Sequence, residues 1–517
     1  MQKYLYTAVF ISGLTSLGVE MAASRLLGNV FGTSNLVWAS IIGLILIYLA
    51  AGYFIGGRWA DRSPNYHTFS RILVGAGVSI ALVPVVSRPI LRAAADAFDQ
   101  LSIGVLAGSF VSVLILLVVP ITLLGTASPF AIRLAIQGLD GVGRTSGRIY
   151  AISTLGSFFG TFLPVLVLIP LIGTYRTFLV LGSLELLTGL AGLWLSSGKK
   201  KTAPYLLTIL LVALLFLLGL PGSAKASPGQ IYETESAYNY IQVLEQNDFR
   251  YLRLNEGQGV HSVFHPTQLN YGGPWEQVSV APFFNAMPHD PMQVQRAAIV
   301  GLAAGTTARQ ATAIYGSIPI DGFEIDPEIV RVGQKFFDMN APNLNVIVQD
   351  GRWGLEHSPY HYSVISVDAY RPPYIPFHMT TREFFQSVYD HLDEDGVMVI
   401  NVGRGLDDRR LINALGSTIL TVFPSLHVVD IPNSFNSIMF ATHKPTNSAN
   451  LAENFSYLKD KADVHPLLMD SIQIAIENLQ PSPAAGPVFT DDLAPVEWIT
   501  NNMVLSFLFT EDMEILR

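Results

Sequence analysis

The sequence of 517 residues contains no cysteine, which excludes disulfide bonds and thiolate metal sites. It is also poor in charge, because only 14% of its residues are Asp, Glu, Lys or Arg, against about a quarter in soluble domains. The net charge is −9 and there is no basic tail, which argues against nucleic acid as a partner. Half of the residues are hydrophobic, and the charged ones are concentrated after position 230. A membrane half followed by a soluble half is therefore predicted.

Long apolar runs fill the first 220 residues. A helix of about 20 residues covers the roughly 30 Å hydrocarbon layer of a bilayer. Each such run is therefore predicted to cross the membrane, which gives a transmembrane bundle of about seven helices over residues 1–220. The predicted spans lie near 5–28, 35–57, 70–92, 101–124, 148–172, 176–196 and 203–220.

The basic residues of the connecting loops alternate in number. The loops after the second, fourth and sixth spans are rich in them, and the other loops are poorer. The positive-inside rule then places the amino terminus in the cytoplasm of a plasma (inner) membrane, and seven spans place the soluble part outside. The residues that carry this signal are Arg58, Arg62, Arg71, Arg133, Arg144, Arg148, Lys199, Lys200 and Lys201.

Ionisable residues also occur inside or at the edge of the spans. Glu20, Arg25 and Glu185 stand where a charge is costly, so each is either a structural, paired group or a functional one. The segment Gly56–Arg62 resembles the cytoplasmic loop between the second and third helices of major facilitator transporters. That resemblance implies that the first six spans form a bundle like half of such a transporter.

The soluble half contains a linker followed by two different sequence patterns. Residues 221–229 are rich in glycine, serine, alanine and proline, as is typical of a linker. Residues 230–290 include alternating apolar and polar stretches and are predicted to form a small β region. From Arg296 strands alternate with helices, so residues 291–517 are predicted to form a Rossmann-like α/β domain with a helical tail.

A small-residue loop follows the first strand of that domain. Gly301, Ala303 and Gly305 allow a tight turn and a close approach of the backbone to a ligand at the start of the next helix. Glu324 stands 23 residues after Gly301, near the place where dinucleotide folds hold a ribose with an acid. Both features can also be explained without a ligand, because tight turns need glycine and acidic side chains stabilise the amino termini of helices.

Two further strands end in an acid. Asp350, followed by Gly351, ends the third strand, and Asp368 ends the fourth. In a parallel sheet the carboxyl ends of the strands share one edge, where ligands of such folds bind. Glu324, Asp350 and Asp368 are therefore predicted to lie around one site.

Residues 230–445 resemble the spermidine synthase family, the aminopropyltransferases that share an S-adenosylmethionine-type Rossmann fold. The end of the chain, 490–497, is similar to the tail of members fused to a membrane domain. The matching segments are 232–238, 301–305, 323–326, 350–351, Asp368, 382–385 and 392–396.

The resemblance implies that an amine attacks decarboxylated S-adenosylmethionine and that methylthioadenosine is released, with no metal. It places Glu324 on the ribose, Asp350 at the adenine and Asp368 beside the reacting centre. We expect Asp368 to act as the base, with Tyr370 and Tyr238 as candidate helpers. The expected partners are a small amine such as putrescine and the lipid bilayer, and a homodimer is left open. The residues implied in cofactor binding are Gly301, Ala303, Gly305, Glu324, Asp350 and Gly351, and those implied near the acceptor are Tyr238, Trp275, Glu276 and Arg371.

Two positions depart from the family pattern. Ala304 replaces an aspartate that contacts the aminopropyl amine, and Arg371 replaces a second aspartate near the diamine. A guanidinium there would repel a diamine. Two alternatives therefore remain: an S-adenosylmethionine-type transferase for a less cationic acceptor, and a ligand-sensing or transport protein without catalysis. The side of the membrane is also unresolved, because adenosyl sulfonium cofactors are kept in the cytoplasm while the loop charges favour the outside.

Overall fold

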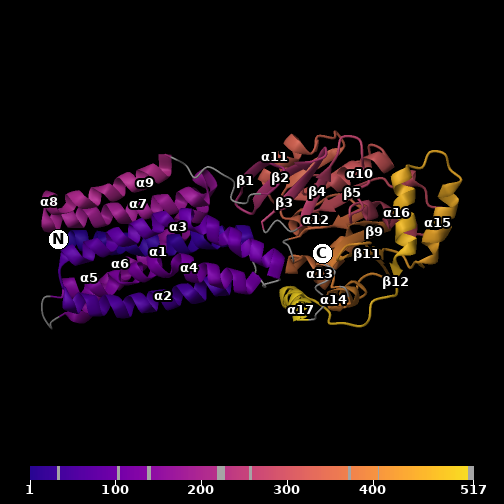
Figure 1. The fold of residues 1–517 in the computed structure, drawn as a ribbon. Coiled ribbons are helices and arrows are strands. Elements are labelled where there is room, and N and C mark those ends of the chain that lie inside the picture. Colours follow the sequence, from indigo (N-terminus) through magenta and orange to yellow (C-terminus); the bar gives the residue numbers. More distant parts are fainter. Residues whose placement is uncertain are drawn as a thin grey trace. The chain divides into compact units, whose positions relative to one another are not determined.

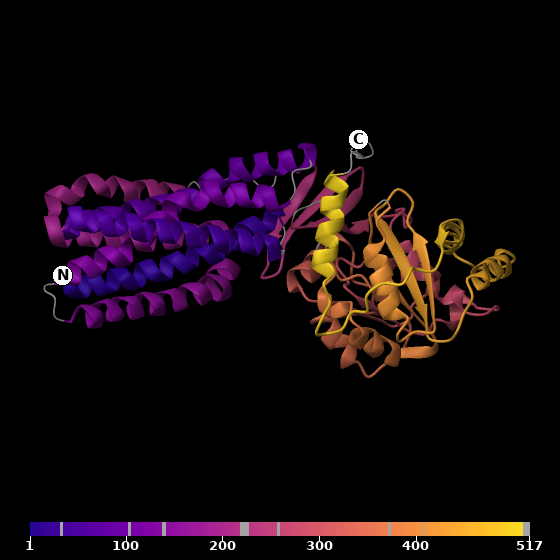
Figure 2. The same cartoon turned by 90° about the horizontal axis from the view of Figure 1, so that it is seen from below.

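The computed structural model describes residues 1–31, 35–101, 105–136, 141–217, 227–255, 259–370, 374–405 and 407–509. The chain forms two compact units, Met1–Ala226 and Ser227–Arg517 (Figures 1 and 2). Arg371 and most of the predicted linker lie outside the described residues.

The first unit consists of helices. Within the described residues, six helical stretches are long and apolar enough to cross a membrane. The helices are α1 Gln2–Phe31, α2 Asn35–Arg62, α3 Tyr66–Leu101, α4 Val105–Gly125, α5 Ala127–Ala135, α6 Val142–Leu163, η1 Pro164–Leu168, α7 Ile169–Ser197, α8 Lys199–Thr202, η2 Ala203–Leu206 and α9 Leu207–Leu217.

The longest stretch, Val142–Ser197, contains two of the predicted spans and reverses direction within itself. Gly173 has the non-helical angles φ 78° and ψ 167°, which interrupt the helix. Helices α1 and α6 run parallel to each other, whereas α1 and α7 run antiparallel. The contacts that establish this are Phe10 with Gly156, Leu14 with Gly160, Tyr4 with Gly192, and Gly18 with Leu181. The described helices therefore traverse this unit seven times.

Of the ionisable residues inside the predicted spans, Glu185 has a partner within the bundle. Its side chain is fully buried on α7, and its Oε1 accepts a hydrogen bond of 2.7 Å from Ser12 Oγ on α1. This bond ties the first helix to α7, which agrees with the structural reading of Glu185.

The second unit begins with a small antiparallel sheet. Its four strands follow one another in the order β1-β2-β3-β4. They are β1 Gln230–Glu235, β2 Tyr240–Gln246, β3 Phe249–Leu254 and β4 Val260–Phe264.

A large sheet forms the core of the same unit, in the order β12-β10-β11-β9-β8-β5-β6-β7. Strands β5 to β9 pair in parallel, whereas β9, β11, β10 and β12 pair antiparallel. The strands are β5 Ala297–Val300, β6 Ile320–Glu324, β7 Leu344–Val348, β8 Tyr362–Val367, β9 Leu392–Gly403, β10 Ser425–Asp430, β11 Asn436–Thr442 and β12 Leu479–Gln480.

Helices cover both faces of this sheet. Ala298 and Val300 of β5 pack toward α12, α13, α14 and α17, whereas Ala297 and Ile299 pack toward η3, α10, α15 and α16. Such alternation is expected of a strand that is buried on both faces. The helices are η3 Glu276–Phe284, η4 Pro291–Gln293, α10 Thr306–Tyr315, α11 Pro327–Phe336, α12 Gly351–Glu356, η5 Phe377–Met379, α13 Arg382–Asp390, α14 Arg410–Ile419, α15 Ala449–Lys459, α16 Pro466–Glu477 and α17 Val496–Phe509.

The predicted fold class is confirmed: an apolar helical bundle is followed by a Rossmann-like α/β unit with a small amino-terminal β region (Figure 1). One detail differs from the parallel sheet expected of alternating strands and helices. After β9 the sheet continues by antiparallel pairing: β11 pairs with β9, β10 with β11, and β12 with β10.

Candidate active site

The turn after β5 brings two strand ends into contact. Gly301 has φ +90°, and a Cβ atom on it would lie 2.6 Å from the backbone oxygen of Asp368 at the end of β8. Only glycine tolerates both that φ value and that approach. The small-residue loop therefore has a structural function, and it also exposes the backbone at the edge of the sheet.

Glu324 lies at the end of β6, contacts this loop and is buried. Its Oε2 accepts a hydrogen bond of 2.9 Å from Ala303 N, and its Oε1 accepts one of 3.0 Å from Asp326 N. Burial raises the pKa of Glu324 to about 7, against the lowering effect of these backbone bonds. Each carboxylate oxygen has a further lone pair that can accept from a ligand.

A cavity of about 290 Å³ adjoins Glu324. Asp350 lies on its wall, where its Oδ1 caps α12 by accepting from Trp353 N at 3.0 Å and its Oδ2 is 3.3 Å from Nε2 of His378. This cavity collects five of the six residues predicted to bind the cofactor, together with Tyr238. The five are Gly301, Ala303, Glu324, Asp350 and Gly351.

Gly305 was also predicted in the cofactor site, but the structure gives it another function. It has φ +86° at the start of α10, and a Cβ atom on it would lie 2.7 Å from Cγ of Met339. Gly305 does not line the cavity beside Glu324. Its absence of a side chain lets Met339 pack against the turn.

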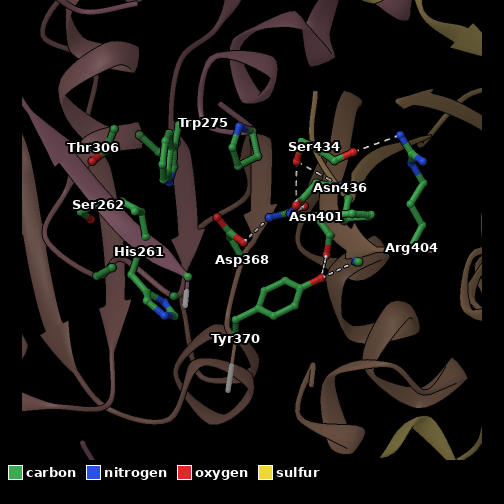
Figure 3. A pocket seen from close by; sticks show the side chains of 18 of the residues that line it. His261, Ser262, Trp275, Thr306, Asp368, Tyr370, Asn401, Arg404, Ser434 and Asn436 are labelled. Atoms are coloured by element: carbon green, nitrogen blue, oxygen red, sulfur yellow. Dashed lines mark hydrogen bonds between the residues drawn. The ribbon is translucent and has the colours of Figure 1, made fainter. Parts of the chain in front are cut away.

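Asp368 also lines a second and larger cavity, of about 610 Å³ (Figure 3). Trp275, one of the residues expected near the acceptor, forms part of its wall. The two cavities share five lining residues: His261, Gly301, Ala303, Asp368 and Tyr370. Asp368 therefore stands where the two cavities meet.

A directed chain of hydrogen bonds ends on Asp368. Ser434 Oγ donates to Asn436 Oδ1 at 2.9 Å, and Asn436 Nδ2 donates to Asn401 Oδ1 at 2.8 Å. Asn401 Nδ2 then donates to Asp368 Oδ1 at 3.0 Å, as Figure 3 shows. Burial raises the pKa of Asp368 to about 6, and the hydrogen bond from Asn401 opposes that shift.

Tyr370 is bound to the strand beside it. Its hydroxyl donates to the backbone oxygen of Asn401 at 3.1 Å and accepts from Gly403 N at 2.7 Å. Burial raises the pKa of Tyr370 above its ordinary value. Its side chain therefore holds the end of β9 in place, next to the carboxylate it was predicted to assist.

Glu276 was predicted near the acceptor, and here the structure corrects the sequence analysis. The carboxylate is buried and bonded to protein groups on both oxygens: Tyr271 N at 2.7 Å, Gln310 Nε2 at 2.9 Å and Gly273 N at 3.0 Å. Neither of the two cavities is lined by Glu276. It fixes the loop that presents Trp275. Arg371, predicted in the same group, lies outside the described residues.

Three polar residues of the site were not predicted. Asn401 stands at the end of an apolar run in β9, so the strand-end rule that found Asp368 could have found it. Asn436 begins the antiparallel strand β11, and His261 lies in β4, so no pattern linked them to the site. Burial lowers the pKa of His261 to about 4, and its Nε2 has no hydrogen-bond partner among the described residues.

Among the described residues, no group of three or more His, Asp or Glu side chains could hold a metal ion. Carboxylates, amides and backbone groups line the two cavities at this edge of the sheet. Two adjoining cavities with a carboxylate between them suit a reaction between two bound molecules.

Comparisons with known proteins identify the family. A model described as the spermine/spermidine synthase domain matches residues 289–454. A probable polyamine aminopropyl transferase of Bifidobacterium longum is 32% identical over 318 residues, which cover 59% of this chain and 70% of that protein. A polyamine aminopropyltransferase of Vibrio vulnificus is 28% identical over 285 residues, which cover 52% of this chain and 88% of that protein.

Among solved structures, a probable spermidine synthase from Corynebacterium glutamicum is 19% identical, with a TM-score of 0.39, and covers 54% of this chain and 94% of that one. The sequence match to the Bifidobacterium protein is strong enough to confirm the predicted resemblance. The chain belongs to the spermidine synthase family of polyamine aminopropyltransferases.

Proposed function

We propose that the protein is a membrane-anchored aminopropyltransferase that uses decarboxylated S-adenosylmethionine and releases methylthioadenosine. The observation that carries the proposal is the position of Asp368 where the two cavities meet. A reaction between an adenosyl sulfonium and an amine needs two adjoining binding spaces with a proton acceptor between them.

The smaller cavity fits the adenosyl part. The carboxylate of Glu324 lines this cavity, where it can accept from the ribose hydroxyls in addition to its bonds from backbone groups such as Ala303 N and Asp326 N. Asp350, which lines the same cavity, is assigned to the adenine. Gly301 lets the sulfonium end approach the backbone beside Asp368. His261 stays neutral at neutral pH because burial lowers its pKa to about 4, so it does not repel the sulfonium.

The larger cavity is assigned to the acceptor amine. An alkylammonium has a pKa near 10 and must lose a proton before it can attack. Asp368 accepts that proton, and its raised pKa of about 6 reduces the mismatch with the amine. The nitrogen lone pair then forms a C–N bond with the aminopropyl carbon. The C–S bond breaks, and its electron pair neutralises the sulfonium to give methylthioadenosine.

The amide chain and Tyr370 act through Asp368. Asn401 holds one carboxylate oxygen, which leaves the other for the amine. Tyr370 fixes the backbone of Asn401 and so is a positioning residue. Every donor in the chain from Ser434 points toward Asp368, which favours its charged, proton-accepting form.

Membrane anchoring is supported by the surface of the first unit. Large apolar side chains such as Leu46, Phe54 and Leu171 are exposed by 60%, 71% and 77%. Large exposed apolar side chains on long apolar helices suit an apolar surrounding, and a lipid bilayer supplies it. Six sufficiently long apolar helical stretches among the described residues suit the same surrounding.

The loop charges support an amino terminus in the cytoplasm and, with seven passes, a second unit on the opposite side. Because the chain has no cysteine, one can be introduced at the exposed residue Ala449. We expect a membrane-impermeant maleimide to label Ala449→Cys in intact cells. Labelling that appears only after lysis would reverse the orientation and place the second unit with the cytoplasmic pool of co-substrate.

The proposed reaction is tested with the purified full-length protein in lipid nanodiscs. It is mixed with decarboxylated S-adenosylmethionine and a panel of amines, and both products are measured by mass spectrometry. Methylthioadenosine and an aminopropylated amine should appear in equal amounts. Binding of methylthioadenosine without consumption of any amine would instead support the ligand-sensing alternative.

A further inference from the structure

We propose that the preferred acceptor is a monoamine whose remaining arm is uncharged and largely apolar, rather than a diamine. This inference rests on the proposed aminopropyl transfer and names the acceptor class for the larger cavity. Three features of the wall of that cavity carry it: its charges, its apolar surface and its size.

The wall offers one negative charge to an acceptor. Of the described residues that line the larger cavity, Asp368 is the only one with a carboxylate. A short diamine carries two positive charges near neutral pH, because each amine has a pKa near 10. Asp368 can serve the reacting amine, and the second ammonium would then have no carboxylate partner on the described wall.

The far part of the wall is positive instead. Arg404 lines the cavity, and its guanidinium donates to the backbone oxygen of Ser434 at 3.1 Å. Its Nε lies 3.6 Å from Asp430 Oδ1, but Asp430 is also held by Arg409 at 2.8 and 3.2 Å. Two guanidinium groups thus share one carboxylate. The remaining positive charge disfavours a second ammonium in this part of the cavity.

Apolar side chains form much of the rest of the wall. Trp275, Leu302, Leu411, Phe435 and Met503 come from five separate segments of the chain and face the same space. An apolar arm would bury surface against them, which contributes about 25 cal/mol per Å². An ammonium placed there would lose its hydration without gaining a partner.

The cavity is also larger than a short diamine requires. Its volume of about 610 Å³ is roughly twice the 290 Å³ of the cavity assigned to the adenosyl part. A four-carbon diamine is smaller than a nucleoside. The extra space accommodates a bulkier arm beyond the reacting amine.

A matched series of acceptors tests the inference with the full-length protein. Putrescine, 4-aminobutanol, pentylamine and 4-aminobutyrate share a primary amine on a short chain and differ in the group at the far end. We expect kcat/KM for pentylamine and 4-aminobutanol to exceed that for putrescine by about tenfold or more. The inference is wrong if putrescine is preferred, or if 4-aminobutyrate is preferred through an ion pair with Arg404.

A variant pair tests the charge of the wall. Phe435 is 40% exposed, so a charged side chain is tolerated there. Phe435→Glu should raise kcat/KM for putrescine about tenfold relative to pentylamine, whereas Phe435→Gln, of similar size and without charge, should not. Unchanged methylthioadenosine affinity shows that both variants are folded. An unaltered preference in folded Phe435→Glu would contradict the inference.

The two proposals fail in different ways. If no amine is consumed while methylthioadenosine still binds, the aminopropyl transfer itself is wrong, and the acceptor class falls with it. If putrescine is converted efficiently and releases methylthioadenosine, the transfer stands and only the acceptor class is overturned.

Discussion

Asn401 Nδ2 donates a hydrogen bond of 3.0 Å to Asp368 Oδ1, and so joins the carboxyl ends of the neighbouring parallel strands β9 and β8. The amide in turn accepts from Asn436, whose own oxygen accepts from Ser434. Burial favours the neutral acid at Asp368, whereas a donated hydrogen bond favours the carboxylate. The amide chain therefore keeps a buried acid in its proton-accepting form near neutral pH.

Removal of the Asn401 donor should shift the pH dependence of catalysis. As Asp368 acts as a base, kcat/KM should rise with pH through its pKa of about 6. Asn401→Leu removes the donor, which raises that pKa, so the acid limb should move up by about one pH unit. Asn436 is one hydrogen bond further from Asp368, so Asn436→Leu should cause a smaller shift in the same direction. An acid limb unchanged in Asn401→Leu would mean that another group is the base.

Binding of methylthioadenosine should be linked to the ionisation of Glu324. Burial raises the pKa of Glu324 to about 7, and only its charged form accepts from both ribose hydroxyls. The apparent affinity should therefore increase about tenfold from pH 6 to pH 8, with release of a proton on binding. Calorimetry in buffers of different ionisation enthalpy measures both quantities. Glu324→Gln should bind more weakly and show no such dependence; a wild-type affinity independent of pH would remove Glu324 from the ribose.

The turn at Gly301 can be tested against a matched glycine. Gly301 and Gly316 have φ of +90° and +78°, but a Cβ atom would meet the Asp368 backbone only at Gly301, and nothing within 4 Å at Gly316. Both alanine variants acquire backbone strain of about 1 kcal/mol or more. Only Gly301→Ala should also displace Asp368 and abolish methylthioadenosine binding. Equal affinities of the two variants would contradict the close approach.

Substitution of Arg371 tests the prediction, made from the sequence alone, that its guanidinium repels a diamine. Arg371 lies outside the described part of the structure. It stands where family members carry an acid that seats the diamine. Arg371→Asp should therefore lower KM for putrescine, and Arg371→Gln should have a smaller effect. A higher KM for putrescine in Arg371→Asp would show that Arg371 points away from the acceptor.

The acidic residues at the carboxyl edge of the sheet could be predicted because the pattern that identifies them is local in the sequence. Glu324, Asp350 and Asp368 each follow an apolar strand, and parallel strands place their carboxyl ends together. Gly301 could be predicted for the same reason, since a tight turn after a strand needs a positive φ. The structure brings these four residues to the two adjoining cavities.

The rest of the site depends on contacts that no local pattern encodes. His261 reaches both cavities from the small sheet, and Asn436 reaches the larger cavity from an antiparallel strand late in the chain. Glu276 was misplaced because a motif fixes only a position in the sequence. The direction of its side chain is set by the backbone of Tyr271 and Gly273.

The most direct test of the central claim compares Asp368→Asn with the wild-type protein. Amide and carboxylate have the same shape, so methylthioadenosine binding by calorimetry should persist while methylthioadenosine release in the presence of an amine should fall by roughly a hundredfold or more. Asp395→Asn, the same change at an exposed acid, should leave both unchanged. Undiminished release by Asp368→Asn would contradict the account, because the acid between the two cavities would then not be the base.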